Sequence, residues 1–157
     1  MATSGSTNFE PDITEFVEEA YERCGLELRT GYDLKTAIRS ANLMLAEWAN
    51  RGLNQWTIET GTQTVTKSTN SYNLGTDVID ILDVTIRRTE GGVTTDIRLD
   101  KLSRSEFFNI PNKATESKPS QYFLDKQNNP TLFLYPTPEN STDIIRFNKL
   151  TRMDDID

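Results

Sequence analysis

The sequence contains no histidine among its 157 residues and only one cysteine, Cys24. Without histidine, Ser-His-Asp and Cys-His catalysis and histidine-ligated zinc are excluded, and the usual general base near neutral pH is missing. One cysteine forms no intrachain disulfide and fits a reducing compartment. Because Cys24 falls on the apolar side of a predicted helix, we interpret it as a small core residue rather than a nucleophile.

Basic charge and long apolar runs are also scarce. The sequence has 17 Lys and Arg residues and 24 Asp and Glu residues, which gives a formal net charge of -7. Proteins that bind DNA need clustered Lys and Arg to contact phosphates. No apolar run approaches the roughly 20 residues of a membrane-spanning helix, and the first residues lack the basic and apolar segments of a secretory signal. We therefore expect no specific DNA binding and no membrane contact.

Motifs for cofactors and metals are missing as well. The sequence has neither GxGxxG nor GxxxxGK[ST], the glycine-rich loops that hold phosphates. Residues 125–130 faintly resemble a calcium loop, but Pro130 stands where the essential glycine of that loop belongs. We interpret this segment as a hairpin turn and expect no cofactor and no metal.

Helical periodicity dominates residues 12–53. Asp12 and Glu15 have the spacing of a capping box, and Gly25 is placed to end the first helix. Asp33 is predicted to cap a second helix, which Gly52 ends. The helices present apolar stripes composed of Ile13, Phe16, Val17, Ala20, Tyr21 and Cys24, and of Leu34, Ala37, Ile38, Ala41, Leu45 and Trp48. Such a hairpin needs further protein to cover both stripes.

From Trp56 onward the apolar residues alternate with a period of two, as in β-strands. Glu90-Gly91-Gly92 predicts a hairpin turn, and Ser103 with Glu106 predicts a capping box over a short helix. Residues 112–119 are expected to be a loop. Predicted strand residues that point inward are Leu82, Val84 and Ile86, then Val93, Thr95, Ile97 and Leu99, and further strands are predicted at 62–66, 121–124, 131–135 and 144–150.

These patterns predict an α+β fold, with an N-terminal antiparallel helix hairpin followed by an antiparallel, meander-like β-rich domain with one short helix. We divide the chain into a flexible N-terminal arm (1–11), the helical hairpin (12–53), the β-rich domain (54–153) and an acidic tail (154–157).

Two helical surfaces are candidates for contacts. The first helix carries Glu15, Glu18, Glu19 and Glu22 away from its apolar stripe. This face is either a solvated surface or an acidic channel surface that repels a passing polyanion. On the second helix, Leu43 projects opposite the apolar stripe, near Arg39 and Glu47. We predict a subunit interface there, although a single exposed leucine is also ordinary.

Catalysis depends on acidic residues if it occurs at all. Asp80, Asp83 and Glu106 are the candidate carboxylates for glycoside hydrolysis. Asp83 alternates outward on its strand, and acidic residues at strand ends are usually just solvated. We therefore expect that the protein is not an enzyme and has no catalytic residues.

The order of several segments resembles the head-to-tail adaptor (connector, or tail tubular A-like) family of short-tailed bacteriophages. The similarity covers most of residues 12–153. It rests on the sequence of residues 41–48, 51–56, 72–74, 78–84, 118–123 and 132–138, among them Leu132-Phe133-Leu134-Tyr135-Pro136-Thr137-Pro138.

This resemblance implies a structural virion protein made in the host cytoplasm and placed at the head-tail junction. It would form a ring, commonly dodecameric, bind the portal protein, support the tail nozzle protein and extend the channel for passing genomic DNA. Similar proteins continue into further helices beyond the last strand, so we expect either a short version or coverage by another chain. The alternatives are a carbohydrate- or receptor-binding tail module and, third, a muralytic hydrolase.

Overall fold

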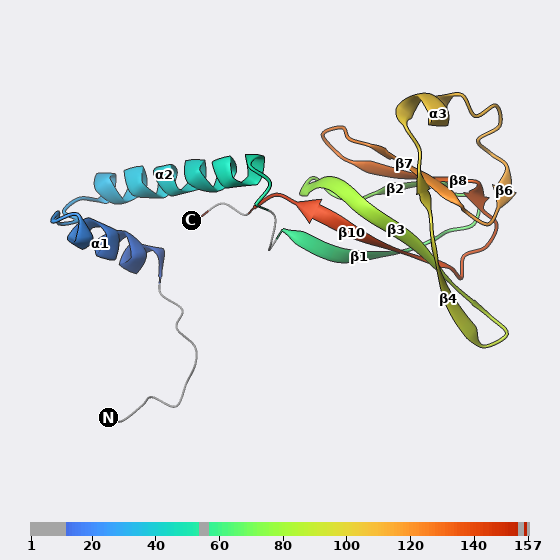
Figure 1. Ribbon diagram of the computed structural model, residues 1–157, viewed down its shortest axis with the longest axis horizontal. Helices are drawn as coiled ribbons and strands as arrows, with labels where there is room; N and C mark the ends of the chain where they lie inside the picture. The colour runs from blue at the N-terminus through green and yellow to red at the C-terminus, as the bar shows by residue number, and fades with distance from the viewer. Residues whose placement is uncertain (1–11, 54–56, 154–155, 157) are drawn as a thin grey trace. The chain divides into compact units, whose positions relative to one another are not determined.

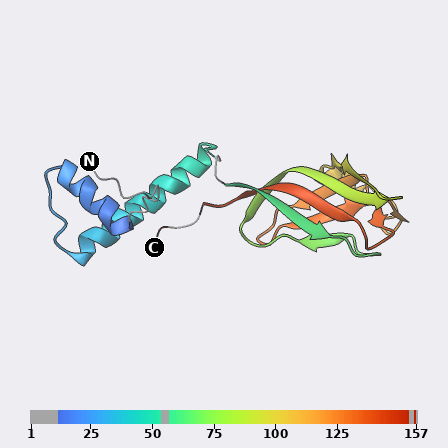
Figure 2. The ribbon, with the colours of Figure 1, turned by 90° about the horizontal axis from the view of Figure 1, so that it is seen from below.

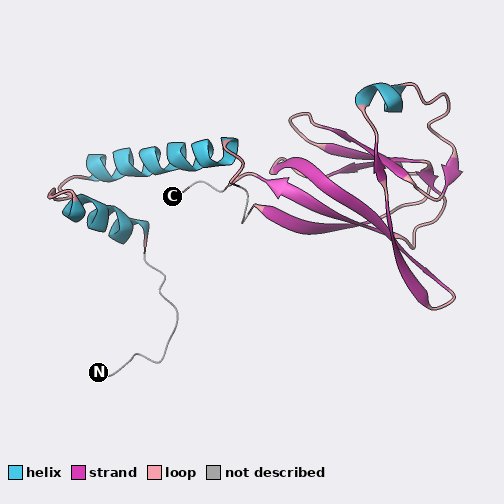
Figure 3. Cartoon of the chain, viewed as in Figure 1, coloured by secondary structure: helices cyan, strands magenta, loops and turns pink. Residues whose placement is uncertain are grey.

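The computed structural model describes residues 12–53, 57–153 and 156. The predicted arm at residues 1–11, the strand start at Trp56 and most of the predicted tail at 154–157 lie outside the described residues. The described residues form two compact units: one comprises residues 12–53 with Met153 and Ile156, and the other residues 57–152 (Figure 1). A helix pair followed by β-sheets and one short helix confirms the predicted α+β class (Figure 3).

The helical unit consists of α1 (Ile13–Arg23) and α2 (Gly31–Asn50). Asp12 caps α1 as predicted, but its carboxylate accepts from the N–H of Ile13 at 2.7 Å, and the predicted capping box with Glu15 does not form. The cap of α2 is Thr30 rather than Asp33. Thr30 Oγ1 accepts from the N–H of Asp33, and the Asp33 carboxylate accepts from the N–H of Thr30, so Asp33 is the third residue of the helix.

Both helices end as their glycines predict. Gly25 and Gly52 adopt positive φ angles of 72° and 79°, in the region that glycine reaches without a steric penalty. After α1, the N–H of Leu26 donates back to the carbonyl of Tyr21 at 2.9 Å; after α2, the N–H of Leu53 donates to the carbonyl of Trp48 at 3.1 Å. These Schellman motifs satisfy carbonyls that the helices leave unpaired.

The second unit holds two four-stranded sheets, which Figure 2 shows as layers. One has the strand order β1-β10-β3-β4 and the other β2-β8-β7-β5, and β6 pairs with β9 apart from both. The strands are β1 (Ile58–Thr64), β2 (Ser71–Asn73), β3 (Val78–Glu90), β4 (Val93–Arg98), β5 (Asp100–Lys101), β6 (Glu116–Ser117), β7 (Gln121–Asp125), β8 (Thr131–Tyr135), β9 (Thr137–Pro138) and β10 (Ile144–Thr151).

The pairing is mostly antiparallel, but it is not a simple meander. The last strand, β10, lies between β1 and β3, so that Ile58 is opposite Leu150. The β5–β7 and β6–β9 pairs are parallel. The β6 strand falls inside residues 112–119, which the sequence predicts to be a loop; the two-residue pairing to β9 is too short to leave a periodic pattern.

The core of the β unit lies between the two four-stranded sheets. Val84 and Ile86 from β3 and Ile145 from β10 are fully buried, as are Leu132 and Leu134 from β8. All five belong to one apolar cluster. Residues from both sheets thus exclude water from a shared interior, the main source of stability for such a unit.

A register shift in β3 overturns the predicted inward position of Leu82. Asn148 pairs with Asp83 but Lys149 pairs with Ile81, so Leu82 is skipped. This bulge changes the phase of the alternation. Ile81 is therefore 1% exposed, whereas Leu82 is 46% exposed.

The hairpin between β3 and β4 has the predicted two-residue turn, in which Gly91 and Gly92 both adopt positive φ. Its return strand is less buried than the alternation predicts. Val93 at the tip is exposed, Ile97 is half-buried, and Leu99 is buried after the strand ends. The tip of the hairpin extends away from the rest of the sheet in Figure 1. The side chain of Val93 at the tip therefore has no facing sheet to pack against.

The short helix α3 (Arg104–Phe108) is the one predicted, with the Ser103–Glu106 capping box in place. It buries Phe107, whose ring stacks on Phe123 of β7 with a centroid distance of 4.9 Å and contacts Phe133 of β8 at 5.3 Å. These three rings fix α3 on the second sheet, because aromatic packing of this kind adds to the burial of apolar area.

Candidate functional site

The apolar stripe of α2 is only partly covered. Leu34, Ile38, Leu45 and Trp48 are all half-buried, and α2 has no buried residue. The reason is length: at 1.5 Å per residue, the 20 residues of α2 span about 30 Å, whereas the 11 residues of α1 span about 16 Å. The shorter helix covers part of the stripe, and Val17 is its one buried residue among those described.

The opposite face of α2 carries the predicted contact residues. Arg39, Leu43 and Glu47 follow each other at intervals of four and are all exposed, and 67% of the surface of Leu43 is open to solvent. Glu47 forms an ion pair with Arg51, the C-cap residue of α2. The three side chains therefore share one helix face. Their role in a subunit interface stays a prediction.

The glutamates of α1 form an exposed acidic surface. Glu15, Glu18, Glu19 and Glu22 are all exposed, and Glu19 is paired with Arg23 at 2.7 Å. Phe16 lies in the same helix and is 57% exposed, although it belongs to the predicted inner stripe. Whether this acidic surface faces a channel stays a prediction.

Cys24 is exposed rather than part of a core, so its predicted burial is wrong. It is the C-cap of α1 and makes the last backbone contacts of that helix. At the end of a short helix, no neighbouring turn is available to cover the side chain, which periodicity alone does not reveal.

The candidate catalytic carboxylates form ion pairs or hydrogen bonds with neighbouring residues of the fold. Asp80 forms ion pairs with Lys126 at 2.7 Å and with Lys101 at 3.3 Å. Burial raises the pKa of Asp80, but its hydrogen bonds to Lys126 and to the N–H of Ile81 outweigh this, and the pKa lies below the ordinary value.

The other two candidates are similar. Asp83 is paired with Arg98 at 2.7 Å. The pKa of Glu106 is lowered, first by its hydrogen bond to the backbone of Ser103 in the α3 cap. A general acid for glycoside hydrolysis needs a raised pKa, and neither Asp80 nor Glu106 has one.

Hollows on the β unit are open to solvent. One of about 380 Å³ is lined by Ser68, Asn70, Lys113, Ala114, Glu116 and Thr137. Ser68 Oγ donates to Glu116 at 2.6 Å, and Lys113 donates to the carbonyl oxygens of Phe108 and Ile110, so their polar groups are already engaged. Residues 12–53, 57–153 and 156 contain no cluster of three or more His, Cys, Asp or Glu that could hold a metal. None of their helices is long and apolar enough to cross a membrane.

Two contacts in the structure were absent from the sequence prediction. Asn42 of α2 binds the main chain of Ile156, and Arg88 of β3 binds Asp143 just before β10. The partners are 114 and 55 residues apart. Neither pair leaves a local spacing in the sequence, so no periodic or motif signal could have found it.

Comparison with known proteins gives one clear result. A family model described as SU10 adaptor protein matches residues 12–155, which include the helix pair and the whole β unit. No curated protein matches the chain in sequence. The match confirms the resemblance found in the segment order. The chain belongs to the SU10 adaptor protein family, a family of structural phage proteins of the head-tail junction.

Proposed function

We propose that the chain acts as a ring-forming head-to-tail adaptor. In this proposal a dodecameric ring docks under the portal protein, extends the channel for the genomic DNA and supports the tail nozzle protein. Membership of the adaptor family supports the general role. The finer details rest on the resemblance and on the surfaces of the helical unit.

The observation that carries the proposal is the incomplete cover of α2. Its inner stripe is half-buried along its whole length, and Leu43 and Met44 are exposed on its other faces. Burial of apolar surface contributes roughly 25 cal/mol per Å², so a helix with no buried residue gains little from its own unit. Neighbouring copies or other virion proteins would supply the missing cover.

The charge distribution supports passage of DNA without adhesion. The net charge is -7, and most of the arginines in the described part of the chain are engaged in ion pairs. Paired arginines compete poorly for phosphates, and an acidic wall repels them. We propose that Glu15, Glu18, Glu19 and Glu22 contribute to such a wall.

The alternatives find less support. A carbohydrate-binding module would present a group of aromatic rings to solvent, but Phe107 and Phe123 are 6% and 5% exposed and stack on each other. Phe108, at 63%, is the one exposed aromatic side chain among the described residues of the β unit. A muralytic hydrolase needs a proton donor, and the candidates Asp80 and Glu106 have lowered pKa values. These observations on the described residues disfavour both alternatives.

Mixing the purified protein with its portal protein tests the proposal. We expect mass measurement to show many copies per complex, and electron-microscope images to show a ring coaxial with the portal. The protein alone is the control for self-association. A chain that stays a single copy in the presence of portal would contradict the adaptor ring.

A further inference from the structure

The side chain of Asn42 binds both main-chain polar groups of Ile156. Its Nδ2 donates to the carbonyl oxygen of Ile156 at 3.1 Å, and its Oδ1 accepts from the N–H of Ile156 at 2.8 Å. Two residues that exchange both bonds in this way are the hydrogen-bonded pair of an antiparallel ladder, here with a side-chain amide in place of one backbone. The contact therefore recognises the main chain and not a particular side chain.

The charges on both sides of this contact are complementary. Arg39 lies three residues before Asn42, and Lys35 lies a further turn back, on the same side of α2. Neither forms an ion pair with a residue that the structure describes. In the sequence, Ile156 is flanked by Asp154, Asp155 and Asp157. The sequence around Ile156 is thus acidic, whereas the α2 face beside Asn42 carries two cations.

We propose that Lys35, Arg39 and Asn42 form a tail-binding face, which takes the C-terminal segment of a second copy in the assembled protein. This inference rests on the proposed ring. A typical hydrogen bond contributes only about 1 kcal/mol, so two partly exposed bonds let the segment leave and rebind. A neighbour's segment makes the same contacts, and in an assembly it is present at an effective concentration on the order of millimolar.

Disulfide trapping between copies tests the proposal in a Cys24→Ser background. One population carries Ala46→Cys, an exposed position one turn beyond Asn42. The other carries Ile156→Cys, which keeps the N–H and the carbonyl that Asn42 binds. The two are mixed with portal and oxidised with a small disulfide reagent. We expect a disulfide-linked pair of chains, and adding Asn42→Ala to the first population should lower its yield about tenfold or more.

Two controls define the specificity of the trap. Glu22→Cys replaces Ala46→Cys as an exposed position on α1, and equal yields from both would overturn the proposal. A chain with both Ala46→Cys and Ile156→Cys measures docking within one copy.

The outcomes separate this proposal from the proposed function, because ring formation is measured on the same samples by mass. Rings with disulfides only within single chains would overturn tail exchange and leave the adaptor ring intact. Disulfides between copies without rings would support exchange and count against the ring. Absence of both kinds of disulfide would overturn the tail-binding face itself.

Discussion

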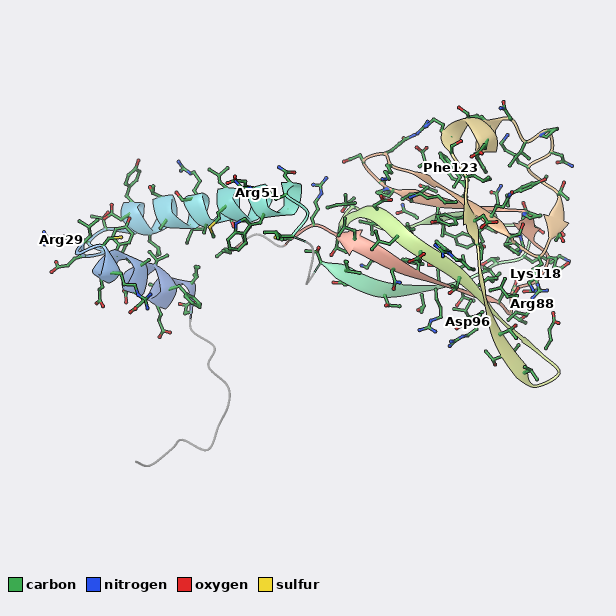
Figure 4. The ribbon with its side chains drawn as sticks, viewed as in Figure 1. Arg29, Arg51, Arg88, Asp96, Lys118 and Phe123 are labelled. Carbon is green, nitrogen blue, oxygen red and sulfur yellow. The ribbon has the colours of Figure 1, made fainter. Side chains whose placement is uncertain are left out.

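Arg88 of β3 holds the carboxylate of Asp143 in a nearly dry environment. Arg88 is labelled in Figure 4. Its Nε lies 2.9 Å and 3.1 Å from the two carboxylate oxygens of Asp143, and its Nη2 lies 2.8 Å from Oδ2. The side chains of Arg88 and Asp143 are 11% and 2% exposed. The bond to Asp143 raises the pKa of Arg88 above its already high ordinary value. The pair joins a strand to the turn before β10, where the carbonyl of Asp143 also accepts from the N–H of Val65.

Asp143→Ala should reduce the free energy of unfolding by about 3 kcal/mol or more. The substitution leaves the largely buried Arg88 guanidinium with only the more exposed carboxylates of Glu139 and Glu90, at 3.1 Å and 3.3 Å. Breaking a buried pair from one side costs on the order of 3–5 kcal/mol. Urea denaturation followed by circular dichroism measures the change. The control is Asp96→Ala, which breaks the exposed pair with Arg87 and should cost far less. Equal losses in both variants would contradict a special role for burial.

Asp80→Asn should make stability less sensitive to acid. The folded pKa of Asp80 is lowered, so its ionised form stabilises the protein above the ordinary aspartate pKa of about 3.9. That contribution is lost as the pH falls from this value through the lower folded pKa. Unfolding free energies between about pH 5 and pH 2 should therefore fall less steeply in Asp80→Asn than in the original protein. The control is Asp100→Asn, which removes an exposed carboxylate of β5.

Gly61→Ala should destabilise the β unit by about 1–3 kcal/mol through overpacking. A Cβ at this position would lie 2.5 Å from Cε2 and 2.7 Å from Cζ of Phe147, whose ring is 7% exposed. Gly31→Ala is the control, because its Cβ would meet nothing within 4 Å, and alanine favours the helix that begins there. Thermal unfolding compares the two. If the clash is the cause, adding Phe147→Leu to Gly61→Ala should recover part of the loss.

Leu43→Asp should abolish assembly while leaving folding unchanged. The side chain is 67% exposed in the single chain, so its replacement should alter the unfolding free energy by no more than about 0.5 kcal/mol. At a subunit contact, the same change would bury an unpaired carboxylate and cost several kcal/mol of assembly energy. Circular dichroism on heating gives the first quantity, and ring yield on portal gives the second. Val93→Asp, equally apolar and 64% exposed, is the matched control. Full assembly of the Leu43→Asp variant would contradict the predicted interface and would show that Leu43 is an ordinary exposed residue.

Local chemistry determined the parts of this protein that sequence reasoning found. Gly25, Gly52 and the Gly91–Gly92 turn lie where only glycine adopts the required φ at no cost, and the Ser103–Glu106 box requires only neighbours three residues apart. The outward position of Leu43 follows from helical periodicity in the same way. Family membership could also be predicted from the sequence, because it depends on the order of segments along the chain.

Only the tertiary structure decided which residues are buried and which distant groups meet. Leu82 alternates like a core residue, but the bulge opposite β10 turns it outward, and Cys24 is left exposed because α1 ends there. The Arg88–Asp143 and Asn42–Ile156 contacts depend on chain segments that folding brings together from 55 and 114 residues apart. Periodicity reports the face on which a residue lies, whereas burial depends on what covers that face, and distant parts of the chain supply that cover.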